Sequence, residues 1–167
     1  MKVTQYSRTK LILFVTVGLV AVRLLFFRAP SEEEMISKFR QQKSQFEQIR
    51  LMLQQDKNVV TVGNDWVETR WLGYGELTRN TVSAERLALY RARLRQLGFS
   101  RVDRVGIEQV QLELFGGGFA DTTWGIGYVW SDAPPQPLVT SAYNSMPMRE
   151  HRNYSPLEGH WYIYHRR

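Results

Sequence analysis

The chain has 167 residues, no cysteine and a formal net charge of +6 at pH 7. The lack of cysteine excludes disulfides, thiolate metal sites and lipid attachment at a cysteine. Residues 1–30 hold five basic and no acidic side chains, which leaves 17 basic against 16 acidic residues in 31–167. Because the larger part is close to neutral, the charge does not indicate a nucleic-acid partner.

The run Leu11–Phe27 is almost wholly apolar and follows three basic residues. As a helix it would span roughly 26 Å, slightly less than a hydrocarbon core of about 30 Å. Arg23 lies one turn from its end, where the guanidinium can reach the headgroups. Fewer basic residues follow the run than precede it, which favours a cytoplasmic N-terminus at residues 1–10. We therefore predict a transmembrane signal-anchor helix at residues 11–28, with residues 31–167 outside the cytoplasm.

A cleaved secretory signal is the alternative for this segment. The apolar stretch Leu11–Val22 has a suitable length for the core of a signal peptide. Cleavage after Ala29 would, however, place the bulky Phe27 three residues before the cut and Pro30 directly after it. Such residues do not suit signal peptidase, so a retained anchor is the prediction.

Two amphipathic helices are expected after the anchor. A capping box at Ser31 begins a helix over Glu32–Gln55, whose apolar residues recur at spacings of three, four and seven. This stripe is expected to pack against the sheet of the same chain, or alternatively to mediate self-association as a short coiled coil. Ser83 caps a second helix, which Gly98 ends in a left-handed conformation.

Strand patterns occupy most of the remaining chain. Gly116–Gly118 are interpreted as a turn, and Asp132–Pro137, with three prolines, as an extended loop. The sequence therefore predicts one α+β domain, in which an antiparallel sheet of about five strands packs against two helices on one face. The expected strands are Val59–Val62, Trp66–Trp71, Val110–Leu114, Trp124–Trp130 and His160–His165.

Aromatic residues are dense in the last two of these strands. Trp124, Tyr128 and Trp130 alternate along one strand, and Tyr162 and Tyr164 along the other. Core packing is expected to explain most of the aromatic residues in this region. These five are nevertheless candidates for binding a partner or ligand, because exposed aromatic rings are common at binding surfaces. The binding surface would be whichever aromatic face the helices leave uncovered.

Catalytic and metal-binding motifs are not found. The three glycines at 116–118 precede a strand pattern and not a helix, so they do not indicate a phosphate site. His151, His160 and His165 have no recognised metal-ligand spacing. We predict no catalytic residue, no metal site and no cofactor. An envelope enzyme that uses Asp121, Glu158 or His160 remains the alternative.

The C-terminal half resembles small uncharacterised bacterial proteins that are anchored to a membrane by a signal helix or a lipid. The resemblance is carried by Gly118-Phe119-Ala120, Gly125–Trp130, Pro137-Leu138 and Leu157–Tyr164, which includes a Gly-x-Trp-Tyr strand. It implies the inner membrane of a bacterium and offers no catalytic residues. The lipid-attachment cysteine of some members is missing here, in agreement with a helical anchor.

These patterns together predict a single-pass membrane protein with a small extracytoplasmic interaction domain. Its expected partner is another envelope protein or a ligand, and an immunity-type role against an incoming toxin would fit by analogy. The alternatives are a hydrolase-like envelope enzyme and a structural tether that forms a homo-oligomer through residues 32–55.

Overall fold

The computed structural model describes residues 29–69, 82–106, 108–119, 122–140 and 152–166. The chain divides into two compact units, residues 1–30 and residues 31–167. Among the described residues, no helix is both long enough and apolar enough to cross a membrane. The predicted cytoplasmic N-terminus at 1–10 and the predicted transmembrane helix at 11–28 lie outside the described residues, so both stay predictions.

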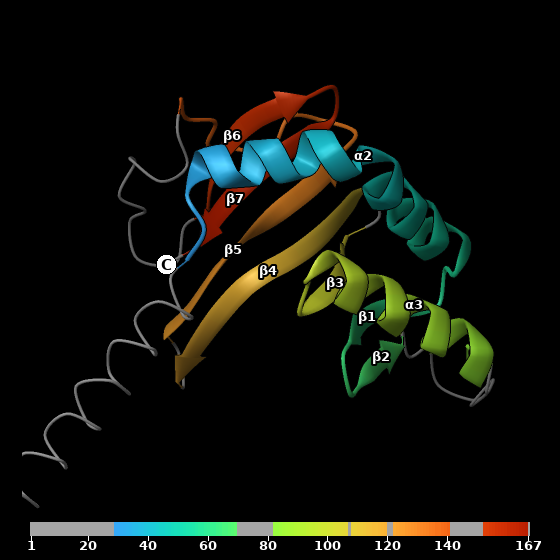
Figure 1. The fold of residues 1–167 in the computed structure, drawn as a ribbon. Coiled ribbons are helices and arrows are strands. Elements are labelled where there is room, and N and C mark those ends of the chain that lie inside the picture. Colours follow the sequence, from blue (N-terminus) through green and yellow to red (C-terminus); the bar gives the residue numbers. More distant parts are fainter. Residues whose placement is uncertain (1–28, 70–81, 107, 120–121, 141–151, 167) are drawn as a thin grey trace, which may run out of the picture. The chain divides into compact units, whose positions relative to one another are not determined.

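The described part of residues 31–167 has an α+β fold, as predicted, with one antiparallel sheet of seven strands (Figure 1). The strand order is β2-β1-β3-β4-β5-β7-β6, and neighbouring strands are hydrogen-bonded. The described helices are α2 (Glu32–Gln55) and α3 (Ala84–Leu97). The strands are β1 (Val59–Gly63), β2 (Val67–Thr69), β3 (Arg101–Val105), β4 (Gln109–Phe119), β5 (Thr122–Ser131), β6 (Arg152–Glu158) and β7 (Trp161–Arg166).

The predicted number of about five strands is wrong, because β3 and β6 were not expected. In β3, Arg101, Asp103 and Arg104 interrupt the apolar pattern that identifies a half-buried strand. In β6, Pro156 argued against a strand, since proline cannot donate to the ladder. This strand lies at the edge of the sheet, where proline is tolerated.

The glycine triplet is also not a turn. Gly116, Gly117 and Gly118 lie within β4 and pair with residues 125, 124 and 123 of β5. Strand β4 therefore continues well beyond Leu114. Because glycine has no side chain, these three positions lack the alternation of apolar and polar residues that predicts a strand. Asp121, a residue of the enzyme alternative, lies outside the described residues.

Helix α2 begins and packs as the sequence predicts. The side chain of Ser31 accepts from the Glu34 amide at 3.2 Å, and the Glu34 carboxylate accepts from the Ser31 amide at 2.6 Å. The ring of Phe46 lies 4.8 Å from that of Tyr128 and 5.7 Å from that of Trp161. The apolar stripe is thus buried against the chain's own sheet, and self-association of this helix stays a prediction. The buried residues of the stripe are Met35, Phe39, Phe46, Ile49, Met52 and Leu53.

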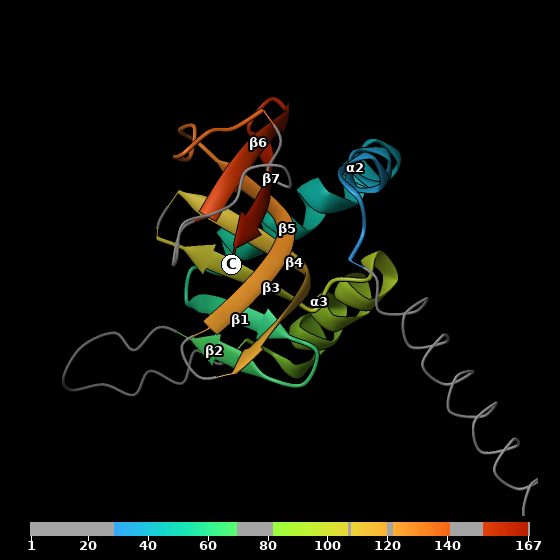
Figure 2. The ribbon, with the colours of Figure 1, turned by 90° about the vertical axis from the view of Figure 1, so that its left-hand side faces the viewer.

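Helix α3 begins at the Ser83 cap and ends at Gly98, which adopts a left-handed conformation with φ of 68°. Two side chains of α3 bind the carboxylate of Asp56, which directly follows α2. Oδ2 of Asp56 accepts from Nε of Arg86 and from the hydroxyl of Tyr90, both at 2.8 Å. The two helices therefore lie beside each other, as Figure 2 also shows.

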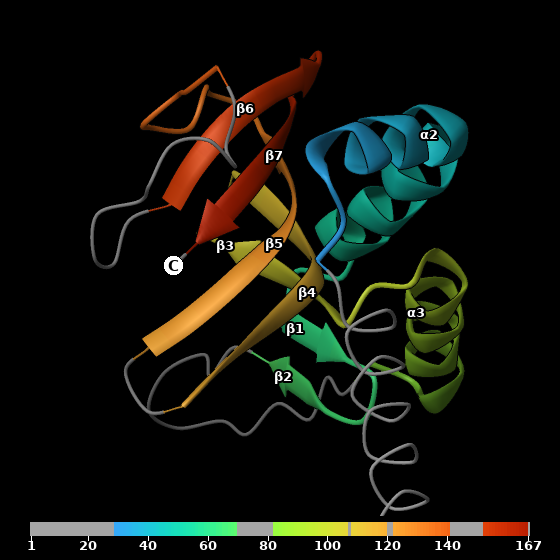
Figure 3. The same ribbon diagram turned by 60° about the vertical axis from the view of Figure 1, so that its left-hand side comes forward.

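Both helices lie on one side of the sheet (Figure 3). Val102, Leu112, Tyr128 and Trp161 point toward them, so the residues that alternate with these four point to the opposite side. We call this opposite side the helix-free face, because no described helix covers it. Its side chains include Thr61, Arg101, Asp103, Gln111, Glu113, Val129, Arg152, Tyr154, Tyr162, Tyr164 and Arg166.

Candidate binding site on the helix-free face

Charged and amide side chains occupy the centre of the helix-free face. Glu113 and Gln111 of β4 are buried there, with exposed fractions of 7% and 1%. Arg101 is their neighbour on β3, while Arg152 and Arg166 come from β6 and β7. A sheet face without a covering layer ordinarily carries polar residues, so the unusual feature here is that Gln111 and Glu113 are buried.

Glu113 is held by two guanidinium groups. Its Oε2 lies 2.9 Å from Nη2 of Arg101 and 3.4 Å from Nη2 of Arg166. The hydroxyl of Ser100 donates to Oε1 at 3.3 Å. A buried carboxylate is tolerated when it is paired and hydrogen-bonded in this way.

Two glycines make room for this carboxylate. A Cβ at Gly116 would lie 2.9 Å from the carboxyl carbon of Glu113, and one at Gly125 would lie 3.2 Å from its Oε2. Gly125 and Gly127 leave one side of β5 bare, and this side is opposite to the helices. It holds the Glu113 carboxylate and the ring of Tyr164, whose Cε1 would be 2.7 Å from a Cβ at Gly127.

Asp103 lies at the β1 side of the same cluster. Its Oδ2 is 3.0 Å from Nε of Arg101, and it also accepts a hydrogen bond from Thr61. Burial nevertheless raises the pKa of the Asp103 carboxyl, and the attraction of Arg101 offsets this effect only in part. Loss of solvation therefore destabilises the ionised form of Asp103 relative to its protonated form.

Gln111 connects the charged cluster to the aromatic residues. Its Nε2 donates to the hydroxyl of Tyr164 at 2.8 Å, and its Oε1 accepts from Nη1 of Arg152 at 2.7 Å. The guanidinium of Arg152 also lies 6.0 Å from the centre of the Tyr164 ring. Burial raises the pKa of the Tyr164 hydroxyl above its ordinary value.

The five aromatic candidates do not form one platform, because they lie on both faces of the sheet. Tyr128 is buried beneath α2, where its hydroxyl donates to the carbonyl of Met35 at 2.9 Å. Trp130 stacks under the guanidinium of Arg50 at 4.5 Å, on the same side. These residues therefore support the core beneath the helices.

Trp124 has the largest exposed fraction of the five, at 37%, and its ring lies 5.0 Å from that of Phe115. Tyr162 and Tyr164 lie on the helix-free face, where they form a small buried cluster with Val129 and Tyr154. Only these two of the five candidates adjoin the charged network.

The residues that sequence reasoning missed are the charged ones: Arg101, Asp103, Glu113, Arg152 and Arg166. One signal was available, since the pattern Gln109 to Leu114 indicates a strand with one polar face. This pattern could not indicate that charged side chains from three other strands lie on the same face. The pairing of β3 and β7 with the central strands brings them together.

Glu158 and His160, which the enzyme alternative would use, contact different partners. Oε1 of Glu158 forms an ion pair with Nζ of Lys43 at 2.6 Å. His160 contacts the Ser131 carbonyl through Nδ1 at 3.1 Å. In the described ranges, no group of three or more histidine, aspartate and glutamate side chains could hold a metal ion.

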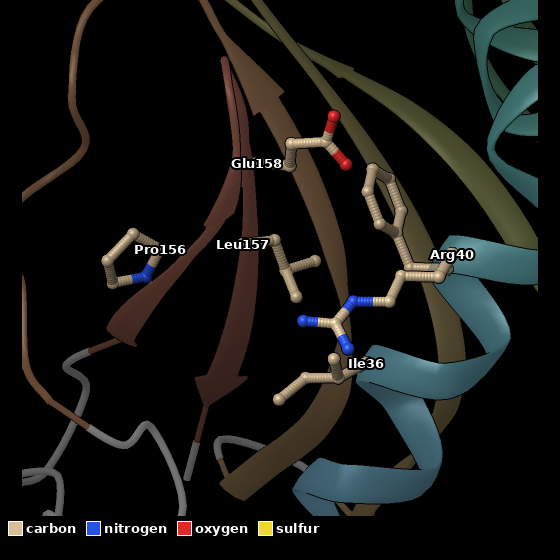
Figure 4. A pocket seen from close by; sticks show the side chains of 6 residues that line it. Ile36, Arg40, Pro156, Leu157 and Glu158 are labelled. Atoms are coloured by element: carbon tan, nitrogen blue, oxygen red, sulfur yellow. The ribbon is translucent and has the colours of Figure 1, made fainter.

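A groove of about 350 Å³ lies between α2 and the edge strand β6 (Figure 4). Its apolar lining comes from Ile36, Phe39, Pro156 and Leu157, and Arg40 and Glu158 add charge. The side chain of Arg40 extends from α2 toward β6 in this view. The groove is separate from the charged network, which lies on the other face of the sheet.

No family model matches the chain, and neither a curated protein nor a solved structure matches it. The interpretation of the site therefore depends on its geometry alone.

Proposed function

We propose that the chain is a single-pass membrane protein whose residues 31–167 bind another envelope protein or a ligand through the helix-free face. The apolar segment at residues 11–28 would anchor the domain in the inner membrane of a bacterium, with the domain outside the cytoplasm. Binding, and not catalysis, is the proposed activity. An immunity-type protein that captures an incoming toxin would be one example.

The observation that carries this proposal is the network of Arg101, Glu113 and Arg166, together with Arg152, on the helix-free face. Buried ion pairs contribute little net stability, because desolvation offsets most of the attraction. Arginine and tyrosine, by contrast, are enriched where binding energy is concentrated in interfaces. The arginines are the partly exposed groups of this face, and the buried rings of Tyr162 and Tyr164 lie beside them.

The membrane part of the proposal rests on the sequence. Only Ala29 and Pro30 separate the apolar segment from the Ser31 cap of α2. A domain anchored in this way would meet a partner in the same membrane at a raised effective concentration.

Photo-crosslinking from both sides of the sheet tests the proposal. Glu68 is exposed and pairs with Thr61, so it lies on the helix-free face, whereas Leu89 is exposed on α3. A photoreactive phenylalanine derivative at position 68, in the full chain in its native membrane, should give a discrete adduct. The same group at position 89 should not.

The adduct at position 68 should weaken when Arg152 and Arg166 are both replaced by glutamine. Adducts of equal yield from both positions, or from neither, would contradict binding at this face. A C-terminal reporter fusion that is active only in the cytoplasm would overturn the proposed orientation.

A further inference from the structure

Two arginines lie directly opposite each other on the helix-free face. Arg152 of β6 and Arg166 of β7 are partners in the antiparallel register. Like charges at such positions are about 5 Å apart at Cβ and destabilise the pair. Gly125 is the next partner of Arg166 along the same row, and it carries no side chain. The space above Gly125 is occupied by the Glu113 carboxylate, which lies near Arg166.

The carboxylates of the network do not balance these two arginines. Glu113 lies closer to Arg101, at 2.9 Å, than to Arg166, at 3.4 Å. No ion pair joins Arg152 to a carboxylate in the described part of the chain, and Gln111 is its hydrogen-bonded partner. Among the described residues of this network, three guanidinium groups face the two carboxylates of Asp103 and Glu113, which is an excess of one positive charge.

Donor groups of these arginines remain available. A guanidinium carries five N–H donors, and Arg166 uses Nη2 while Arg152 uses Nη1. Nε of Arg166 is shielded from water, so an anion from outside could reach only the Nη groups of this side chain. Both side chains are partly exposed, so an anion could reach them from outside.

We propose that Arg152 and Arg166 bind carboxylate groups of an acidic segment in the protein partner. The inference rests on the proposed function and names the chemistry of its ligand. The network already accommodates one carboxylate, that of Glu113, in contact with two guanidinium groups. A carboxylate of the partner would occupy the equivalent position beside Arg152, where planar guanidinium groups offer paired donors.

Fluorescence anisotropy with labelled peptides tests this inference. The full chain, held in phosphatidylcholine nanodiscs, is titrated with hexaglutamate and, in parallel, with hexaglutamine. We expect binding of hexaglutamate only, with an affinity that falls as salt is added. The double variant Arg152→Gln, Arg166→Gln should bind hexaglutamate about tenfold more weakly, as for the loss of a charge-assisted contact.

Arg95→Gln is the matched control, because Arg95 is an exposed arginine on α3. It should bind hexaglutamate as the wild type does, and circular dichroism should show that all variants are folded. Equal binding by the double variant, or no binding of hexaglutamate, would overturn the inference. Competition by inorganic phosphate well beyond that of sodium chloride at equal ionic strength, or binding to phosphatidylglycerol nanodiscs in place of the peptide, would also overturn it by assigning the site to phosphate groups.

The peptide titration tests the acidic ligand, whereas the photo-crosslink tests the binding face, so the two results can be read separately. If hexaglutamate does not bind but the photo-crosslink from position 68 persists, the helix-free face binds a partner by other contacts. If both are absent, the face is not a binding surface.

Discussion

Glu113 and Asp103 are two carboxylates on the same sheet face that are stabilised to different degrees. Glu113 is near two guanidinium groups and a hydroxyl, whereas Asp103 has one guanidinium and lies where burial dominates. The raised pKa of Asp103 means that the folded state favours its protonated form. Stability from this group is therefore present at acid pH and is lost as the pH rises through the folded pKa.

Asp103→Asn should remove this pH dependence. Because the folded pKa lies above the ordinary value of 3.8, the wild type should gain thermal stability relative to the variant as the pH falls from 7 toward 4. Arg101, Arg152, Glu113 and Thr61 are the charged and polar groups near Asp103. Thermal unfolding of both proteins at several pH values measures the effect. A wild type that loses stability relative to the variant on acidification would contradict it.

Gly127→Ala should be strongly destabilising. The new Cβ would clash with the carbonyl oxygen of Leu112 and would lie 2.7 Å from the ring of Tyr164. Relief of this clash would require the backbone of β4 to shift. We therefore expect a loss of about 2–4 kcal/mol in the free energy of unfolding. Gly159→Ala is the control, since nothing lies within 4 Å there and only its φ of +60° opposes alanine, at about 1 kcal/mol. Equal losses in the two variants would refute the close approach at Gly127.

At the scale of elements, α2 ends without a basic residue in its last turn. Arg104 of β3 supplies this charge from the sheet. Its Nη2 donates to the carbonyls of Leu53 and Asp56, and its Nε donates to that of Val59 at 3.1 Å. A cation at a helix C-terminus interacts favourably with the helix dipole, so this contact joins the helix end to the sheet.

Arg104→Met should therefore destabilise the domain by about 1–3 kcal/mol, through the carbonyls left without a charged donor. Arg95→Met, in the exposed last turn of α3, should cost less than about 0.5 kcal/mol. Chemical denaturation followed by tryptophan fluorescence compares the two. A small effect at Arg104 would mean that water replaces the guanidinium at the end of α2.

Elements with a regular apolar period could be predicted from the sequence, and those without one could not. The bounds of α2 agree with the prediction, because its cap and its stripe are both local signals. Strand β3 was missed because its alternating positions on the helix-free face hold the charged residues Arg101 and Asp103. The charged site could not be predicted, because it depends on which strands pair, and pairing is not a local property of the sequence.

At the scale of the whole molecule, the sheet has two different faces. One is covered by α2 and α3 and holds the aromatic core, and the other carries the arginines and carboxylates. If α2 were a tether between copies of the chain, it would have to use residues outside its buried stripe. Sedimentation equilibrium of the full chain in detergent tests this alternative, and we expect a monomer at all concentrations. A dimer that is lost on substitution of exposed α2 residues would favour the tether.

Single-cysteine labelling in intact spheroplasts tests the account most directly, since the chain has no cysteine of its own. Glu68→Cys reports on the helix-free face and Leu89→Cys on the outer surface of α3. With a membrane-impermeant maleimide, we predict that position 89 reacts equally fast in spheroplasts and in purified nanodiscs, whereas position 68 reacts much more slowly in spheroplasts. Equal rates at position 68 in both preparations, or no reaction at either position until the membrane is broken, would contradict the account.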